Sequence, residues 1–178
     1  MAKRKSARRP KGPQPLGVCR GSLGLALLML MFYGFGMVMS IALNWGTTAS
    51  AWLVLLWSLT QLAMGFAVFC LYRHQRLARW AAVAVLLVVS SLLTTYPNVG
   101  TPLLRTAVEA LGLVGFSLVL YDVGKILRQP MGTASGLIFL AVIGTLLQTP
   151  LTAFAGLVLL VLGAYLAARQ LGLLGLQP

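Results

Sequence analysis

Long apolar stretches separated by short polar segments run through the sequence after residue 20. Each stretch approaches the length of about 20 residues that an α-helix needs to cross about 30 Å of hydrocarbon. We therefore expect an all-α fold, a polytopic membrane protein whose residues 21–169 form a six-helix transmembrane bundle. The pattern predicts helices at about 22–43, 51–72, 80–96, 102–124, 132–149 and 150–169.

Two of the predicted helices carry strong start signals. Thr101 and Thr149 each precede a proline, so each helix begins with an N-cap hydroxyl followed by proline at its first position. Because the fifth and sixth stretches meet at Thr149, the turn between them is tight and the two form an antiparallel hairpin. A re-entrant hairpin remains the alternative to two full crossings.

The segments between the stretches alternate between basic and neutral. Arginines crowd residues 73–79, and basic residues also follow the fourth and sixth stretches, whereas the other connections carry no charge. Because basic segments stay in the cytoplasm, both termini are predicted to be cytoplasmic, in the cell (plasma) membrane. Every one of the 14 Lys and Arg residues except Arg105 then lies on the cytoplasmic side.

The composition excludes a water-soluble protein. Of the 178 residues, 59% are hydrophobic and only 9% are charged, against about 25% charged residues in a soluble domain. So few charges cannot cover a soluble surface, and a disordered chain would need low hydrophobicity. The net charge of +12 arises because only two residues are acidic.

Much of the positive charge lies at the start of the chain. Residues 1–20 are predicted to form a disordered basic cytoplasmic arm, and residues 170–178 a short cytoplasmic tail. The arm contains no aromatic residue for stacking on bases, so nucleic-acid binding is not expected. Its basic side chains are instead expected to contact anionic lipid headgroups: Lys3, Arg4, Lys5, Arg8, Arg9 and Lys11.

Few residues are available for catalysis or for a cofactor. Cys19 and Cys70 give no disulfide framework, and His74 is the only histidine. Haem, a thiolate zinc site and an iron–sulfur cluster each need more ligands, so we expect no cofactor, no metal and no catalytic site. Cys70 and His74 are one helical turn apart, but without a third soft ligand we interpret them as a buried thiol beside an interfacial histidine.

Glu109 lies inside the fourth predicted helix, about 10 Å below its outer boundary if the helix starts at residue 102. A carboxylate at that depth must be paired, hydrated or protonated. Arg105 lies four residues earlier on the same face, so one interpretation is a structural ion pair. The other is an ion or proton site in an outward-facing polar vestibule, which Glu109 and Arg105 would share with Gln61, Ser90, Ser91 and Thr94.

The second acidic residue, Asp122, lies one turn from the cytoplasmic end of the same helix. Lys125 or an arginine of residues 73–79 can neutralise it, which predicts a solvated structural ion pair.

Small residues mark close contacts between helices. They recur in the sixth stretch at Thr152, Gly156, Gly163 and Ala167, and in the fifth at Gly132 and Gly136. Such residues let helices approach closely, either within the bundle or between copies of the chain.

Two classes of function fit these predictions, and no motif points to a known family. Without a complete catalytic set, the chain is not expected to be an enzyme. The first class is a non-catalytic subunit or scaffold that docks to lipid, to other membrane subunits or to a second copy of itself. The alternative is a small proton- or cation-coupled transporter with its vestibule centred on Glu109.

Overall fold

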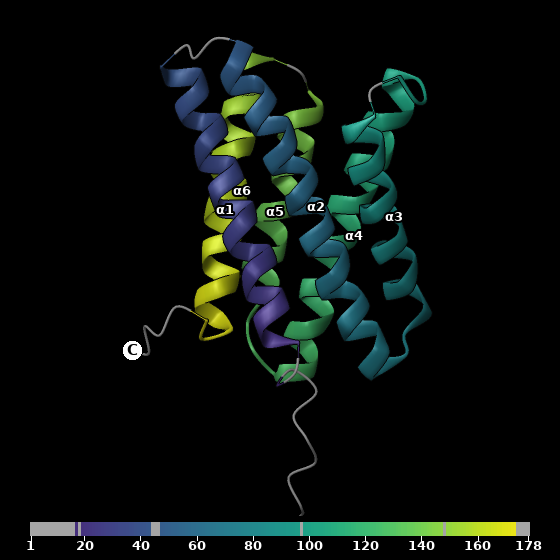
Figure 1. Ribbon diagram of the computed structural model, residues 1–178. Coiled ribbons are helices and arrows are strands. Elements are labelled where there is room, and N and C mark those ends of the chain that lie inside the picture. The colour runs from purple at the N-terminus through teal and green to yellow at the C-terminus, as the bar shows by residue number, and fades with distance from the viewer. Residues whose placement is uncertain (1–16, 18, 44–46, 97, 148, 174–178) are drawn as a thin grey trace, which may run out of the picture.

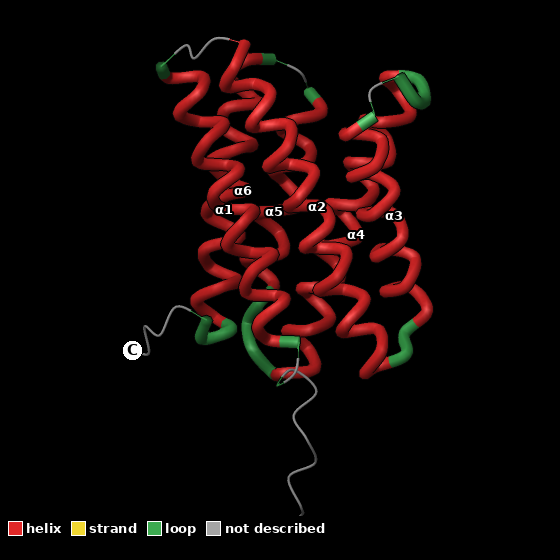
Figure 2. The backbone as a smooth tube through the Cα atoms, in the orientation of Figure 1, coloured by secondary structure: helices red, strands yellow, loops and turns green. Residues whose placement is uncertain are grey.

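The fold consists of helices joined by short connections. The computed structural model describes residues 17, 19–43, 47–96, 98–147 and 149–173, and within them the chain forms six helices and no strand (Figures 1 and 2). This confirms the predicted all-α, six-helix fold. The helices are α1 (Arg20–Ala42), α2 (Thr47–Gln75), α3 (Ala78–Thr95), α4 (Pro102–Leu127), α5 (Gly132–Leu146) and α6 (Pro150–Gln170).

Five of these helices are long and apolar enough to cross a membrane. By helix length and hydropathy, the chain is therefore a multi-pass membrane protein. Helix α5 has only 15 residues, which at 1.5 Å per residue gives about 22 Å, less than the roughly 30 Å of a hydrocarbon core. It ends before the predicted limit of 149, so the choice between a full crossing and a re-entrant hairpin stays a prediction.

The helices close into a ring. Each helix packs against the next one along the chain, and α1 also packs against α6. The helices alternate in direction, so the start of α1 and the end of α6 meet at one end of the bundle (Figure 1). There Arg20 Nη2 donates a hydrogen bond to the carbonyl oxygen of Gly172 at 2.5 Å.

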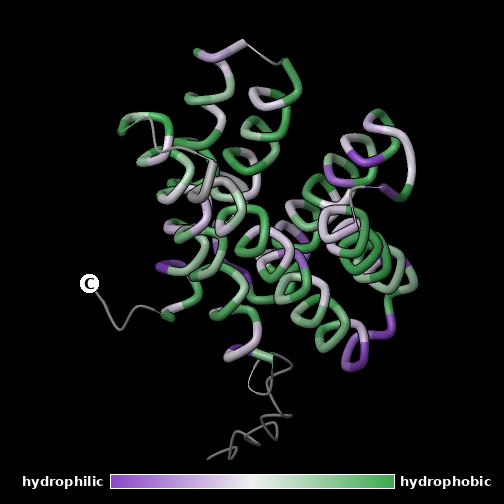
Figure 3. The backbone as a smooth tube through the Cα atoms, turned by 45° about the horizontal axis from the view of Figure 1, so that its top comes forward, coloured by the Kyte–Doolittle hydropathy of each residue, from purple (hydrophilic) through white to green (hydrophobic). Residues whose placement is uncertain are grey.

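We call this end the basic end, because the α2–α3 and α4–α5 connections with their arginines also lie there. The connections at the opposite, neutral end contain no charged residue. Hydrophilic residues lie mainly near the helix ends and in the connections (Figure 3). The side of the membrane that each end faces stays a prediction, and the arm residues Lys3 to Lys11 lie outside the described part of the chain.

An ion pair joins α3 to α4 at the basic end, as the sequence predicted for Asp122. Arg79 Nη2 lies 2.9 Å from Asp122 Oδ2, and the indole nitrogen of the buried Trp80 donates to the same oxygen at 3.2 Å. Lys125, the other candidate partner, lies over the ring of Tyr121 at 4.3 Å from its centroid.

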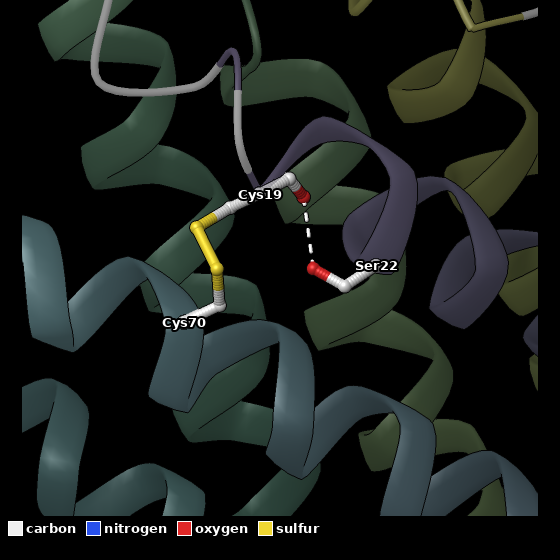
Figure 4. The surroundings of a disulfide bond; sticks show 3 residues. All are labelled: Cys19, Ser22 and Cys70. Carbon is white, nitrogen blue, oxygen red and sulfur yellow. Dashed lines mark hydrogen bonds between the residues drawn. A yellow bond between two sulfur atoms is a disulfide. The ribbon is translucent and has the colours of Figure 1, made fainter.

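A disulfide between Cys19 and Cys70 joins the start of α1 to α2 near the basic end (Figure 4). The interpretation of Cys70 as a free buried thiol was therefore wrong. The two cysteines are 51 residues apart, and they meet because α1 and α2 pack antiparallel over similar lengths. Cys19 is fully buried, and Ser22 Oγ donates to its carbonyl oxygen at 2.9 Å.

The two predicted N-caps are confirmed. The Thr101 hydroxyl accepts a hydrogen bond from the backbone N–H of Leu104 at 3.2 Å, and the Thr149 hydroxyl accepts one from Thr152 at the same distance. Both caps precede proline at the helix start. They satisfy backbone donors that have no partner within their own helix.

Helices α5 and α6 approach closely enough for backbone contact. A Cβ atom added to Gly156 would lie 2.8 Å from the carbonyl oxygen of Ala141, and one added to Gly144 would lie 2.9 Å from that of Thr152. The small residues predicted on α6 therefore serve packing inside the bundle. Within the bundle, the predicted Gly132–Gly136 pair makes no close contact, because a Cβ at Gly136 would meet nothing within 4 Å. On α5 the close contact to α6 is made by Gly144 instead, and a contact of Gly132 and Gly136 with a second copy of the chain stays a prediction.

We predict that Gly156→Ala destabilises the bundle, because the added methyl group forces the α5 and α6 backbones apart. The expected loss is about 1–3 kcal/mol of unfolding free energy, measured by denaturant titration in mixed micelles. Gly136→Ala is the matched control and is expected to be neutral or to stabilise by up to about 1 kcal/mol, since alanine favours helix. Equal effects of the two variants would contradict the close contact.

Candidate cation site

The candidate site is built from polar side chains on α2, α3 and α4. Gln61 lies on α2, Ser90 and Thr94 are one turn apart on α3, and Glu109 lies two turns into α4. The spacing of four residues places Ser90 and Thr94 on one face of α3. Because α3 packs between α2 and α4, that face meets both neighbours.

A chain of hydrogen bonds connects these four residues. Gln61 Nε2 donates to Ser90 Oγ at 2.8 Å, and Thr94 Oγ1 lies 2.9 Å from Glu109 Oε1. Thr94 Oγ1 also lies 3.4 Å from Gln61 Oε1 and 2.9 Å from the carbonyl oxygen of Ser90. Gln61 and Ser90 are buried, whereas Thr94 and Glu109 are half-buried.

The Thr94 hydroxyl has one proton and three neighbouring acceptors. When Glu109 is ionised, Thr94 can donate to its carboxylate. When Glu109 is protonated, it can donate to Thr94 Oγ1. The Thr94 hydroxyl then rotates and donates its own proton to the Ser90 carbonyl oxygen or to Gln61 Oε1. Both protonation states of Glu109 therefore fit the same positions of the heavy atoms.

Ser91, another predicted site residue, belongs to a neighbouring cluster. Its hydroxyl donates to the carbonyl oxygen of Ser58 at 2.9 Å and lies 2.8 Å from Ser58 Oγ. Thr95 Oγ1 lies 2.8 Å from the same Ser58 hydroxyl. This cluster links α2 to α3 without contacting Glu109, so it is an interhelical hydrogen-bond contact beside the candidate site.

Arg105 does not pair with Glu109. Among the described residues, Arg79 and Asp122 form the only ion pair within 4.0 Å. The Arg105 guanidinium turns toward the α3–α4 connection, donating to the carbonyl oxygens of Val99 and Gly100 at 3.3 Å each. The predicted structural ion pair was wrong, because spacing along a helix fixes a shared face but leaves a long side chain free to reach the helix end.

Glu109 lines a cavity of about 300 Å³. Liquid water occupies about 30 Å³ per molecule, so the cavity has room for several waters. It lies in the half of the bundle nearer the neutral end, between α1, α2, α4, α5 and α6. Its lining comprises Tyr33, Trp57, Thr106, Glu109, Ala110, Leu113, Val142, Thr145, Leu146, Leu157 and Leu160.

Of the lining residues, the sequence prediction named only Glu109 as a site residue, and the ones it missed include Tyr33, Trp57 and Thr106. Tyr33 and Trp57 stack with their ring centroids 4.3 Å apart, which joins α1 to α2 at the cavity wall. Thr106 lies three residues before Glu109, and this spacing was a signal that could have found it. Nothing in the local sequence distinguishes Tyr33 and Trp57 from aromatic residues that only fill space.

Together, the fold and this cavity define a multi-pass helical membrane protein with one carboxylate inside its bundle. No protein-family model, curated protein or solved structure matches the chain significantly.

We predict that Ser90→Ala destabilises the protein, because it leaves the buried Gln61 amide without its acceptor. Interhelical hydrogen bonds in membranes contribute about 0.6 kcal/mol on average and up to about 1.7 kcal/mol. A double-mutant cycle with Gln61→Leu, measured by denaturant titration, is expected to give a coupling energy in that range.

Thr133→Ala, at an exposed position in the first turn of α5, is the control and is expected to show no coupling to Gln61→Leu. A coupling energy of zero for the Ser90–Gln61 pair would contradict the bond.

Proposed function

We propose that this protein is a small proton-coupled carrier in which Glu109 is the group that binds and releases the proton. One observation carries the proposal: a carboxylate inside the bundle faces a cavity of about 300 Å³ and has no basic side chain within 4.0 Å among the described residues. Ionisable groups at membrane depth are costly and typically mark ion or proton pathways.

The hydrogen-bond chain supports this role. Glu109 Oε1 contacts Thr94, while the carboxylate also lines the cavity through which water or a cation reaches it. Proton uptake requires only that the Thr94 hydroxyl reverse its donor direction, so neither protonation state leaves a buried polar atom unpaired. Gln61 Oε1 and the carbonyl oxygen of Ser90 also contact the Thr94 hydroxyl, and neither residue lines the cavity.

The distribution of charge supports an orientation for the carrier. In the proposed orientation the basic end lies in the cytoplasm and the cavity lies in the outer half of the membrane. The arm residues Lys3 to Lys11 would then meet the anionic headgroups of the inner leaflet.

A second candidate function is docking to lipid, and one observation favours it. An apolar groove of about 210 Å³ lies between α2 and α3, and its lining contains no polar side chain: Gly65, Phe66, Phe69, Ala84, Val85, Val88 and Val89. Such a groove fits a lipid acyl chain. This function does not require Glu109, so the variants below separate the two candidates.

The proposed orientation predicts which connections water-soluble reagents reach. In a Cys19→Ser/Cys70→Ser background, a cysteine at Asn98 is expected to react with an impermeant thiol reagent added to intact cells. A cysteine at Gln129 is expected to react only after permeabilisation, because its connection lies at the basic end. The reverse pattern at both positions would overturn the orientation.

Glu109 is the only glutamate in the chain, so selective ¹³C labelling of glutamate gives a single side-chain carboxyl resonance. We expect that resonance, measured by NMR in bilayers, to move between the ionised and protonated positions as pH is lowered. Glu109→Gln removes the signal, and Thr94→Val is expected to shift it because the hydrogen bond to the carboxylate is lost.

Proton flux is measured in proteoliposomes with a trapped pH-sensitive dye and an imposed membrane potential. Glu109→Gln is expected to reduce the flux to that of protein-free liposomes. Asp122→Asn makes the same chemical change at the other acid, near the basic end, and is expected to retain it. A carboxyl resonance that does not respond to pH, or equal flux in the wild type and Glu109→Gln, would refute the carrier.

A further inference from the structure

Three metal-binding side chains meet near the basic end, far from the Glu109 cavity. The sulfur atoms of Cys19 and Cys70 and an imidazole nitrogen of His74 all lie within 4.8 Å of one another. Cys70 and His74 are separated by one turn of α2, while Cys19 comes from the start of α1. The sequence showed only two of these ligands together, and the antiparallel packing of α1 on α2 supplies the third.

The arrangement suits entry of an ion from water. Cys19 is buried and Cys70 is half-buried, but His74 is exposed and lies one residue before the end of α2. An ion can therefore enter past the exposed imidazole of His74 and bind the sulfur atoms of Cys19 and Cys70, which are less exposed. The disulfide in Figure 4 occupies the two sulfur atoms that would bind it.

We propose that Cys19, Cys70 and His74 form a redox-gated site for one thiophilic metal ion, Zn²⁺ or Cu⁺. Two thiolates and one imidazole are a ligand set that both ions accept. With Zn²⁺ the two thiolates give an electrically neutral site, which suits its partly buried position, and water can fill the fourth position. With Cu⁺ three ligands suffice, and the site then carries one net negative charge.

Reduction opens the site. The disulfide takes two electrons and two protons from a dithiol, whose own sulfur atoms form a disulfide, and the S–S bond between Cys19 and Cys70 breaks. The metal ion then replaces the two thiol protons, which leave to water. The reverse exchange closes the site: a disulfide compound takes two electrons from the two thiolates and two protons from water and becomes a dithiol, while the S–S bond between Cys19 and Cys70 re-forms. Two of the three ligands are then lost and the ion is released. This chemistry needs neither Glu109 nor the proposed carrier function.

The test uses the purified full-length protein in detergent, reduced with a dithiol that is then removed under anaerobic conditions. Co²⁺ is the spectroscopic probe, because a cobalt–thiolate bond gives a charge-transfer band. We expect one Co²⁺ per reduced chain, displaced by Zn²⁺, and no band from the oxidised protein. Competition with a Cu⁺-specific chelator, measured separately, tells whether Cu⁺ binds more tightly than Zn²⁺.

Single variants test the three ligands. Loss of an outer-shell partner typically weakens metal binding about 10–100-fold, so loss of a direct ligand in His74→Gln is expected to weaken it at least about tenfold. Gln75→Ala, at the neighbouring position on α2, is the matched control and is expected to bind as the wild type does. Circular dichroism verifies that each variant keeps its helix content.

Three outcomes would overturn the proposal. One is a disulfide that a dithiol does not reduce in the folded protein. Another is reduced wild type that binds Co²⁺, Zn²⁺ and Cu⁺ no better than Cys19→Ser/Cys70→Ser. The third is metal binding that His74→Gln leaves unchanged.

Discussion

In a bilayer, a polar group that loses water must find its partner within the protein, and this requirement accounts for most of the polar contacts in the bundle. Helix backbones satisfy themselves except at their ends, where Thr101 and Thr149 accept from backbone N–H groups. Hydroxyls inside the bundle bond to neighbouring helices or to carbonyls of their own helix, as Ser91 and Thr94 do. The same requirement places Asp122 beside Arg79 and Trp80.

Glu109 meets the requirement in a different way. Among the residues that the structure describes, its carboxylate has one hydrogen-bond partner, Thr94, and otherwise borders a cavity rather than a basic side chain. The cavity is lined by side chains of five helices, with two aromatic rings on one side and smaller aliphatic and hydroxyl side chains on the others. Elsewhere the packing is much tighter, and at Gly144 and Gly156 the backbones of α5 and α6 touch. The uneven packing leaves space around the one carboxylate that the bundle does not neutralise.

Much of this fold could be predicted from the sequence, because bilayer thickness and helix rise fix the element lengths. The two N-caps followed from a threonine before a proline, which is local information. Three features needed the three-dimensional arrangement. Cys19 meets Cys70 only because of how α1 is aligned along α2. Gly144 makes its close contact only because α6 lies opposite it. Tyr33 lines the cavity only because five helices leave a space there.

In the candidate site, too, some features could be predicted from the sequence and others needed the three-dimensional arrangement. The shared depth of Glu109 and Ser90 followed from the helix rise, and Thr94 and Gln61 indeed join them through hydrogen bonds. The direction of Arg105 did not follow, because a four-residue spacing gives a face but not a rotamer. The nearby carbonyl oxygens of Val99 and Gly100 bind its guanidinium at the helix end. Burying that charge beside Glu109 would require its desolvation, whereas the helix end lets it stay near water.

The contacts between neighbouring helices of the ring differ in strength, and under the proposed carrier function this difference determines which helices can move. Helix α1 is tied to α2 by a disulfide, and α5 is tied to α6 by backbone contact. By contrast, α3 and α4 are joined by side-chain packing and by the Arg79–Asp122 ion pair, and Thr94 bonds to Glu109 between them. Hydrogen bonds and exposed ion pairs exchange partners at a cost of about 1 kcal/mol each, whereas a covalent bond does not. For the proposed carrier, this difference makes α3 and α4 the helices expected to move Glu109 relative to the cavity, because the disulfide and the glycine contact hold the other two helix pairs in place.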